Sequence, residues 1–157
     1  MKKEFNISKS ELDFINLYTG NLYNEGFLTP SEIKEMLKIN KKIQLNNGKK
    51  HKDLKEALKI GIEVFKKYNK SVEGKDNLNK PLGWKHPLVI VEVQDEETSE
   101  LIENYLEERY KYNDVVHIER KNKELNIVAK PIGIPQVLDP IRPFIIKTIQ
   151  DENHFKK

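Results

Sequence analysis

The stretch LVIVEV, residues 88–93, is where the chain changes from helical to strand periodicity. On an extended chain Val89, Val91 and Val93 fall on one side, while Leu88 and Ile90 fall on the other. Apolar residues on both sides are typical of a strand inside a sheet. The sequence therefore predicts that a sheet begins at this stretch and that the strand is central to it.

The residues after this strand predict one helix and two further strands. Acidic residues 95–97 suit the first turn of a helix over residues 97–111, because the helix dipole favours negative charge there. Residues 115–118 and 125–128 have strand character and are joined by a polar turn. A strand, a helix and a strand in one sheet form a right-handed parallel crossover, so we expect a small mixed sheet. Residues 144–149 are expected to add an edge strand.

The first half of the chain is helical in character. Residues 10–13 are expected to cap a helix that runs to about Tyr23, and residues 29–32, TPSE, carry a stronger capping signature. Residues 42–48, KIQLNNG, alternate like a short strand and then favour a turn. A second amphipathic helix is expected from Asp53. Its apolar face comprises Leu54, Ala57, Leu58, Gly61, Ile62 and Phe65.

These patterns predict an α+β protein, in which a helical N-terminal part is followed by a small mixed sheet of strand–helix–strand–strand order. Residues 1–70 form the lysine-rich helical part with a short hairpin, residues 71–86 form a linker or loop, and residues 87–157 form the sheet part. A single compact domain overall remains an alternative at this length.

Charge is unevenly distributed along the chain. Residues 34–75 hold thirteen lysines and five acidic residues, a balance of +8, whereas residues 76–108 hold two lysines and nine acidic residues, a balance of −7. The net charge of +3 is too small to argue by itself for a nucleic-acid partner. The two stretches are either ordinary solvated faces or surfaces for partners of opposite charge.

Several classes of chemistry lack their residues in this sequence. There is no cysteine, which excludes disulfides, thiolate catalysis and cysteine-ligated zinc. The four histidines have no metal-binding spacing, and no phosphate-binding glycine loop or nucleophile motif occurs. We therefore expect no cofactor, no metal and no catalytic residue. The chain also has no long apolar stretch and no apolar segment after its N-terminal lysines, so a cytoplasmic location is expected.

Lysines beside the predicted hairpin form one candidate surface for nucleic acid or an acidic partner. Lysine suits phosphate contacts, but arginine, the commonest reader of guanine, is absent from residues 1–108. Residues 28–45 resemble the first helix and turn of a helix-turn-helix, yet the turn at residues 46–48 leaves no room for a recognition helix. The candidate residues are Lys41, Lys42, Lys49, Lys50, Lys52 and Lys55.

Four glutamates form a second candidate surface, for a basic partner. Glu96, Glu100, Glu103 and Glu107 recur at intervals of three and four residues along one helical face. A metal-dependent nuclease needs carboxylates from different elements, so this row favours docking over catalysis. Trp84, the only tryptophan, is a candidate interface anchor, with a core position as the alternative.

The function expected from these features is non-enzymatic binding of a macromolecule. Length and an AT-rich type of residue usage favour a small phage or mobile-element protein, such as an anti-defence or anti-CRISPR inhibitor that docks on a host enzyme. The expected partner is a protein, with a nucleic-acid-processing enzyme as one form, and no membrane. The first alternative is a DNA-binding regulator that uses the lysine-rich, helix-turn-helix-like part, and the second is a metal-dependent nuclease.

Overall fold

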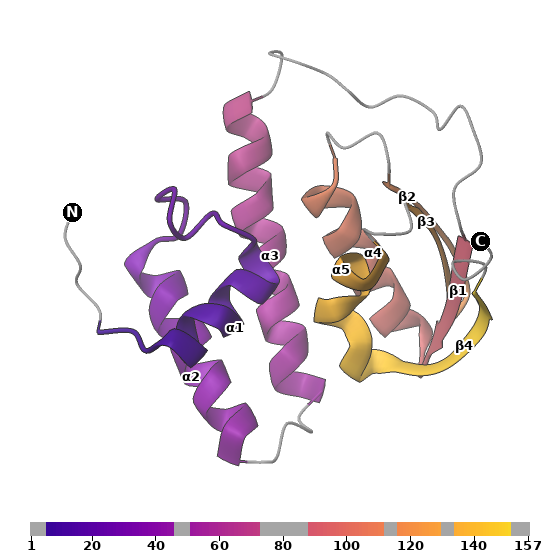
Figure 1. Ribbon diagram of the computed structural model, residues 1–157, viewed down its shortest axis with the longest axis horizontal. Helices are drawn as coiled ribbons and strands as arrows, with labels where there is room; N and C mark the ends of the chain where they lie inside the picture. The colour runs from indigo at the N-terminus through magenta and orange to yellow at the C-terminus, as the bar shows by residue number, and fades with distance from the viewer. Residues whose placement is uncertain (1–5, 46–50, 73–87, 112–115, 130–133, 152–157) are drawn as a thin grey trace.

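The computed structural model describes residues 6–45, 51–72, 88–111, 116–129 and 134–151 (Figure 1). Three N-terminal helices precede a four-stranded antiparallel sheet that is interleaved with helices, which confirms the α+β class. The helices are α1 (Lys9–Thr19), α2 (Pro30–Leu45) and α3 (His51–Val72). They are followed by β1 (Leu88–Val93), α4 (Glu96–Arg109), β2 (Val116–Lys121), β3 (Glu124–Ala129), α5 (Ile134–Leu138), the 3-10 helix η2 (Asp139–Phe144) and β4 (Ile145–Asp151).

The strands lie in the order β2-β3-β1-β4, so β1 is internal and β4 is at an edge, as predicted. Every neighbouring pair is antiparallel. The expectation of a mixed sheet was wrong in this respect. β1 and β2 do run in the same direction on either side of α4, but β3 returns between them and pairs with both. The crossover therefore produces no parallel pair.

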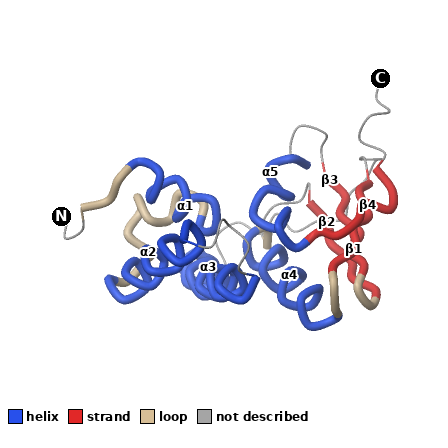
Figure 2. Tube along the Cα trace, turned by 90° about the horizontal axis from the view of Figure 1, so that it is seen from below, coloured by secondary structure: helices blue, strands red, loops and turns tan. Residues whose placement is uncertain are grey.

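α4 and α5 lie between α3 and the sheet (Figures 1 and 2). On one side of β1, Val89, Val91 and Val93 are buried. Ile102 and Leu106 of α4 are fully buried as well, and α4 contacts β1, β2 and β3. One continuous apolar core extends from α1 to η2. The sheet is thus held against the helical part through α4.

The first helix begins two residues earlier than expected. Ser8 is its N-cap, and its hydroxyl accepts a hydrogen bond from the Glu11 N–H (3.2 Å), while the Glu11 carboxylate accepts one from the Ser8 N–H (2.9 Å). Both members of a capping box are therefore present at Ser8, whereas the prediction placed the cap at residue 10. The helix ends at Thr19, before the predicted Tyr23, because Gly20 adopts a φ of 61°.

The second helix confirms its predicted cap but not its predicted end. The Thr29 hydroxyl accepts from the Glu32 N–H (3.1 Å), and the Glu32 carboxylate accepts from the Thr29 N–H (2.8 Å). α2 then continues to Leu45, so the strand predicted at residues 42–45 is wrong. Ile39 is buried and Ile43 is half-buried against the core, which continues the helical spacing through the supposed strand. The predicted turn at residues 46–48 lies outside the described residues.

All six apolar-face residues predicted for α3 are buried, although the helix begins at His51 rather than at Asp53. Two ion pairs join α3 to α2 at opposite ends. Lys42 lies 4.0 Å from Asp53, and Lys67 lies 2.7 Å from Glu32. Since these pairs link the end of α2 to the start of α3 and the reverse, the two helices are antiparallel neighbours.

The division into parts at residues 71–86 stays a prediction. Residues 71–72 belong to α3, and the rest of the proposed linker lies outside the described ranges. Across the proposed boundary, the Asn69 amide of α3 donates to the carbonyl oxygen of Glu108 in α4 (2.8 Å). None of the helices in the described ranges combines the length and the apolar character that a membrane crossing requires.

Candidate macromolecule-binding surfaces

Three exposed lysines lie along one side of α2. Lys34, Lys38 and Lys41 are separated by four and three residues, which places them on neighbouring turns of the helix. No acidic side chain pairs with any of them in the part of the chain that the structure describes. We call these three residues the lysine row.

Only one predicted lysine belongs to the lysine row. Lys41 is part of it, whereas Lys42 faces Asp53. Lys52 is exposed on α3, and Lys55 is half-buried there. The positive charge of Lys55 contributes to holding the pKa of Asp95 below its usual value, after the larger effect of the hydrogen bonds from Thr98.

The remaining predictions for this surface lie outside the described residues. Lys49 and Lys50 fall there, as does the proposed anchor Trp84. The structure instead adds Lys34 and Lys38, which sequence reasoning missed. Their spacing to Lys41 was visible in the sequence and requires a helix only as far as residue 41, but the candidate lysines had been grouped around the predicted hairpin instead.

A depression of about 330 Å³ opens between the start of α1 and the second half of α2. Asn40 lies in its wall with only 8% of its surface exposed. The Asn40 amide has no hydrogen-bond partner among the described residues. Glu11 contributes the α1 side, and α2 contributes Leu37, Lys38, Asn40, Lys41 and Gln44.

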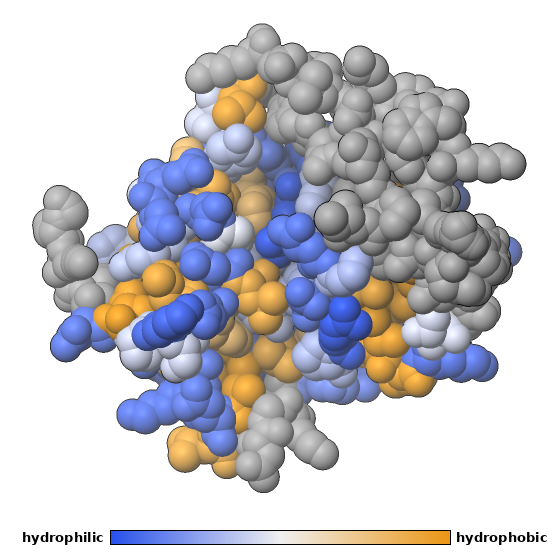
Figure 3. All heavy atoms as spheres, in the orientation of Figure 1, coloured by the Kyte–Doolittle hydropathy of each residue, from blue (hydrophilic) through white to orange (hydrophobic). Residues whose placement is uncertain are grey.

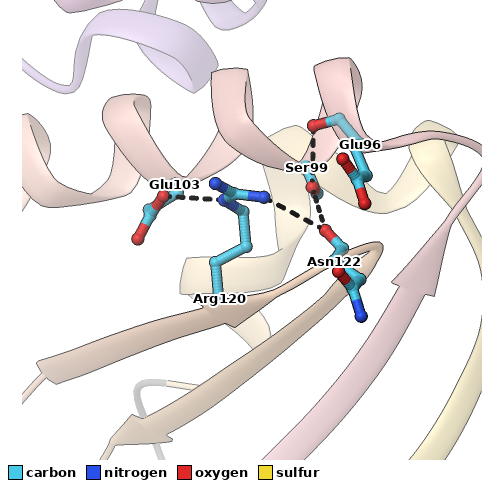
Figure 4. Close-up of polar contacts among 5 residues, drawn as sticks. All are labelled: Glu96, Ser99, Glu103, Arg120 and Asn122. Atoms are coloured by element: carbon cyan, nitrogen blue, oxygen red, sulfur yellow. Dashed lines mark hydrogen bonds and ion pairs between the residues drawn. The ribbon is translucent and has the colours of Figure 1, made fainter.

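Three of the four predicted glutamates of α4 are exposed, and the fourth is paired with an arginine of the sheet. Glu96, Glu100 and Glu107 are exposed, whereas Glu103 is half-buried. The Glu103 carboxylate accepts a hydrogen bond from Arg120 Nε of β2 at 2.9 Å, as Figure 4 shows. We call the four glutamates the acidic row.

Arg120 connects the acidic row to the sheet. Its Nη1 donates to the carbonyl oxygen of Asn122 (3.2 Å), and the Ser99 hydroxyl of α4 donates to the same oxygen (2.6 Å; Figure 4). The hydrogen bond to Glu103 raises the pKa of Arg120, and the charges of Glu103, Glu100 and Glu96 add to that effect. These contacts hold α4 against the β2–β3 turn, and the positive charge of Arg120 partly balances the negative charge of the acidic row.

The described residues contain no group of three or more histidine, cysteine or acidic side chains placed to hold a metal ion. His51 packs against Phe144, with ring centroids 5.1 Å apart. Figure 3 shows hydrophilic and hydrophobic residues intermixed across the helical part of one face.

Comparison with known proteins gave no match to a family model, to a curated protein sequence or to a solved structure. The functional interpretation therefore rests on the geometry of these surfaces.

Proposed function

We propose that this protein acts by binding another macromolecule, without catalysis, and that it docks through the acidic row on a basic protein surface. The observation that carries this proposal is the exposure of Glu96, Glu100 and Glu107 on one side of a single helix. With a rise of about 1.5 Å per residue, the eleven steps between Glu96 and Glu107 span roughly 16 Å. That length suits contact with several basic side chains at once.

The backbone beneath the acidic row is well anchored, which favours binding. Asp95 caps α4 by accepting from the Thr98 N–H (2.8 Å), and Ile102, Tyr105 and Leu106 are fully buried under the helix. A surface that is already ordered loses less conformational entropy when it binds. Complementary charge then accelerates association and opposes partners of the wrong sign.

The partner class that we propose is an enzyme that processes nucleic acid, such as a host defence nuclease. These enzymes hold phosphate backbones with lysine and arginine, so their surfaces offer the charge that the acidic row complements. A small phage or mobile-element inhibitor is the biological form that fits the length and the residue usage of the chain.

The test is a binding screen against purified nucleases with the intact protein and two matched variants. Glu96→Gln/Glu100→Gln/Glu107→Gln removes three charges from the acidic row, and Glu25→Gln/Glu35→Gln/Glu63→Gln removes three exposed charges elsewhere. We expect the first variant to weaken binding at least about tenfold and the second to leave it within about twofold. Equal weakening by both variants contradicts docking through α4. Magnesium-dependent hydrolysis of nucleic acid by the protein itself contradicts the non-enzymatic part.

The second candidate function is binding of DNA phosphates, which the exposed lysine row favours. The antiparallel arrangement of α2 and α3 differs from the crossing of a helix-turn-helix, so we expect phosphate contacts rather than base recognition. If all three lysines contact phosphates, the logarithm of the binding constant falls by roughly 2.7 per tenfold rise in salt. Replacement of the row by glutamine abolishes that dependence on labelled duplex DNA. A flat salt response of the intact protein excludes this function.

A further inference from the structure

We propose that the depression between α1 and α2 binds a single nucleotide, with its phosphate at Lys38 and Lys41 and its base edge at the amides of Asn40 and Gln44. These residues alone carry the proposal, which is independent of docking through the acidic row.

The first argument is the state of Asn40. Its side chain is more than nine-tenths buried, yet no hydrogen bond to its amide exists among the described residues. In contrast to the enclosed partnerless atoms of Asn16, Thr98 and Tyr110, the Asn40 amide atoms still reach solvent, so they can bond to a ligand without giving up a protein partner. Asn40 lines the depression, so a ligand bound there is placed to replace water at this amide.

The second argument is the arrangement around Asn40. Leu37, Asn40, Lys41 and Gln44 lie at i, i+3, i+4 and i+7 of α2, so they face the same side, and Lys38 adjoins them. The site therefore has two ammonium groups, two amides and one apolar side chain. The ammonium groups suit a phosphate, the amides suit a base edge, and Leu37 suits the flat face of a base or a sugar.

The third argument is Glu11, which excludes a bare anion as the best ligand. Its Oε1 accepts from the Ser8 N–H in the capping box of α1, so the carboxylate is oriented before any ligand arrives. Its negative charge opposes a small anion but accepts a hydrogen bond from a hydroxyl group. A sugar hydroxyl beside a phosphate meets both requirements.

The size of the depression and its two amide groups restrict the class of ligand further. About 330 Å³ is near the lower limit of ligand pockets, which suits one nucleotide and not a duplex. Asparagine and glutamine amides pair with adenine through its N6 and N7 positions. An adenine nucleotide is therefore the expected ligand, either free or as one residue of a single strand.

The experiment is an NMR titration of the intact protein with adenosine monophosphate, inorganic phosphate and a short oligodeoxyadenylate, followed on the side-chain amides of Asn40 and Gln44. We expect both amides to shift with either nucleotide ligand and to move little with phosphate. An oligonucleotide that binds at least about tenfold more tightly assigns the site to single strands, and equal affinity assigns it to free nucleotides. No amide shift with either ligand, or equal shifts with phosphate alone, overturns the proposal.

Matched variants separate the site from general charge. Lys41→Gln is expected to weaken binding about tenfold. Lys34→Gln removes the same charge from a lysine that does not line the depression, so it is expected to leave binding unchanged. Gln44→Ala changes an exposed residue and is expected to weaken binding without unfolding the chain. Asn40→Leu is expected to abolish binding while the melting temperature changes little, since no hydrogen bond of this amide to the described residues is lost. Equal effects of Lys34→Gln and Lys41→Gln, or binding that survives Asn40→Leu, overturn the proposal.

Discussion

The hydroxyl of Tyr105 joins two helices at a single point. It donates to the carbonyl oxygen of Tyr18 near the end of α1 (2.7 Å) and accepts from Nη1 of Arg109 (2.7 Å). Arg109 also donates to the carbonyl oxygen of Leu17 (2.8 Å). Since the last carbonyls of a helix have no partner within it, these side chains of α4 complete the hydrogen bonding of α1.

Replacement of Tyr105 by phenylalanine is expected to lower the free energy of unfolding by about 1–3 kcal/mol, because the Tyr18 carbonyl loses its buried donor. Tyr110→Phe is the matched control. The Tyr110 hydroxyl is buried without a partner among the described residues, so its removal should cost little or even stabilise the fold. Urea denaturation measures both variants. A larger loss for Tyr110→Phe than for Tyr105→Phe contradicts this assignment of hydrogen bonds.

At Gly61, α3 lies directly against α1 and α4. A Cβ atom at this position would lie 2.6 Å from Cε1 of Tyr105 and 2.7 Å from the carbonyl oxygen of Tyr18. Alanine stabilises a helix interior by about 1 kcal/mol relative to glycine, but overpacking costs roughly 1–3 kcal/mol. We expect Gly61→Ala to destabilise the protein on balance, as measured by thermal unfolding. Lys66→Ala on the exposed side of α3 serves as control and should change stability by less than about 0.5 kcal/mol.

Among the elements, α2 shows both what the sequence determines and where local patterns mislead. Its start was predictable because Thr29 and Glu32, only three positions apart in the sequence, make a complete capping box. Its end was not, since the alternation at residues 42–45 fits a strand when it is considered alone. The burial of Ile39 and the packing of Ile43 decide for the helix, and both depend on residues distant in sequence.

The same error hid part of the candidate site. A helix that ends before residue 42 leaves Asn40 and Gln44 on different elements. The acidic row was predictable because its helix was correctly identified. Its ion pair to Arg120 was not, since that pair depends on how the β2–β3 turn meets α4.

The cap of α2 can be tested directly. Thr29→Ala removes the hydroxyl that accepts from the Glu32 N–H and should reduce stability by about 1 kcal/mol. Ser31→Ala, also exposed in the first turn, should have an effect well below that, since no side-chain hydrogen bond of Ser31 occurs among the described residues. Chemical denaturation of the two variants distinguishes a true cap from a general effect on the first turn.

For the whole molecule, the buried tyrosines make stability depend on alkaline pH. Burial raises the pKa of Tyr18, with a further contribution from Tyr105, and burial raises the pKa of Tyr105 against the opposing effect of Arg109. In the unfolded chain both groups ionise near pH 10. Above that pH the unfolded state binds fewer protons than the folded state, so stability is complete below about pH 10 and falls as the pH rises.

We therefore expect the free energy of unfolding, measured by urea denaturation, to stay constant up to about pH 10 and then to decrease by on the order of 1 kcal/mol per pH unit for each buried tyrosine. Tyr105→Phe should show a shallower decrease than the parent chain. The absorbance of ionised Tyr18 and Tyr105 should appear together with unfolding. Ionisation of all six tyrosines near pH 10 without unfolding contradicts the prediction.

The position of β1 has a consequence for synthesis of the chain. Both of its neighbours, β3 and β4, come later in the sequence, whereas α1, α2 and α3 contact one another and precede it. During synthesis the three N-terminal helices can therefore pack together as soon as they have been made. β1 cannot pair with its neighbours until residues 124–151 have been added. A chain that stops before residue 124 contains β1 with both of its backbone edges unpaired, and the truncated product would aggregate through these edges.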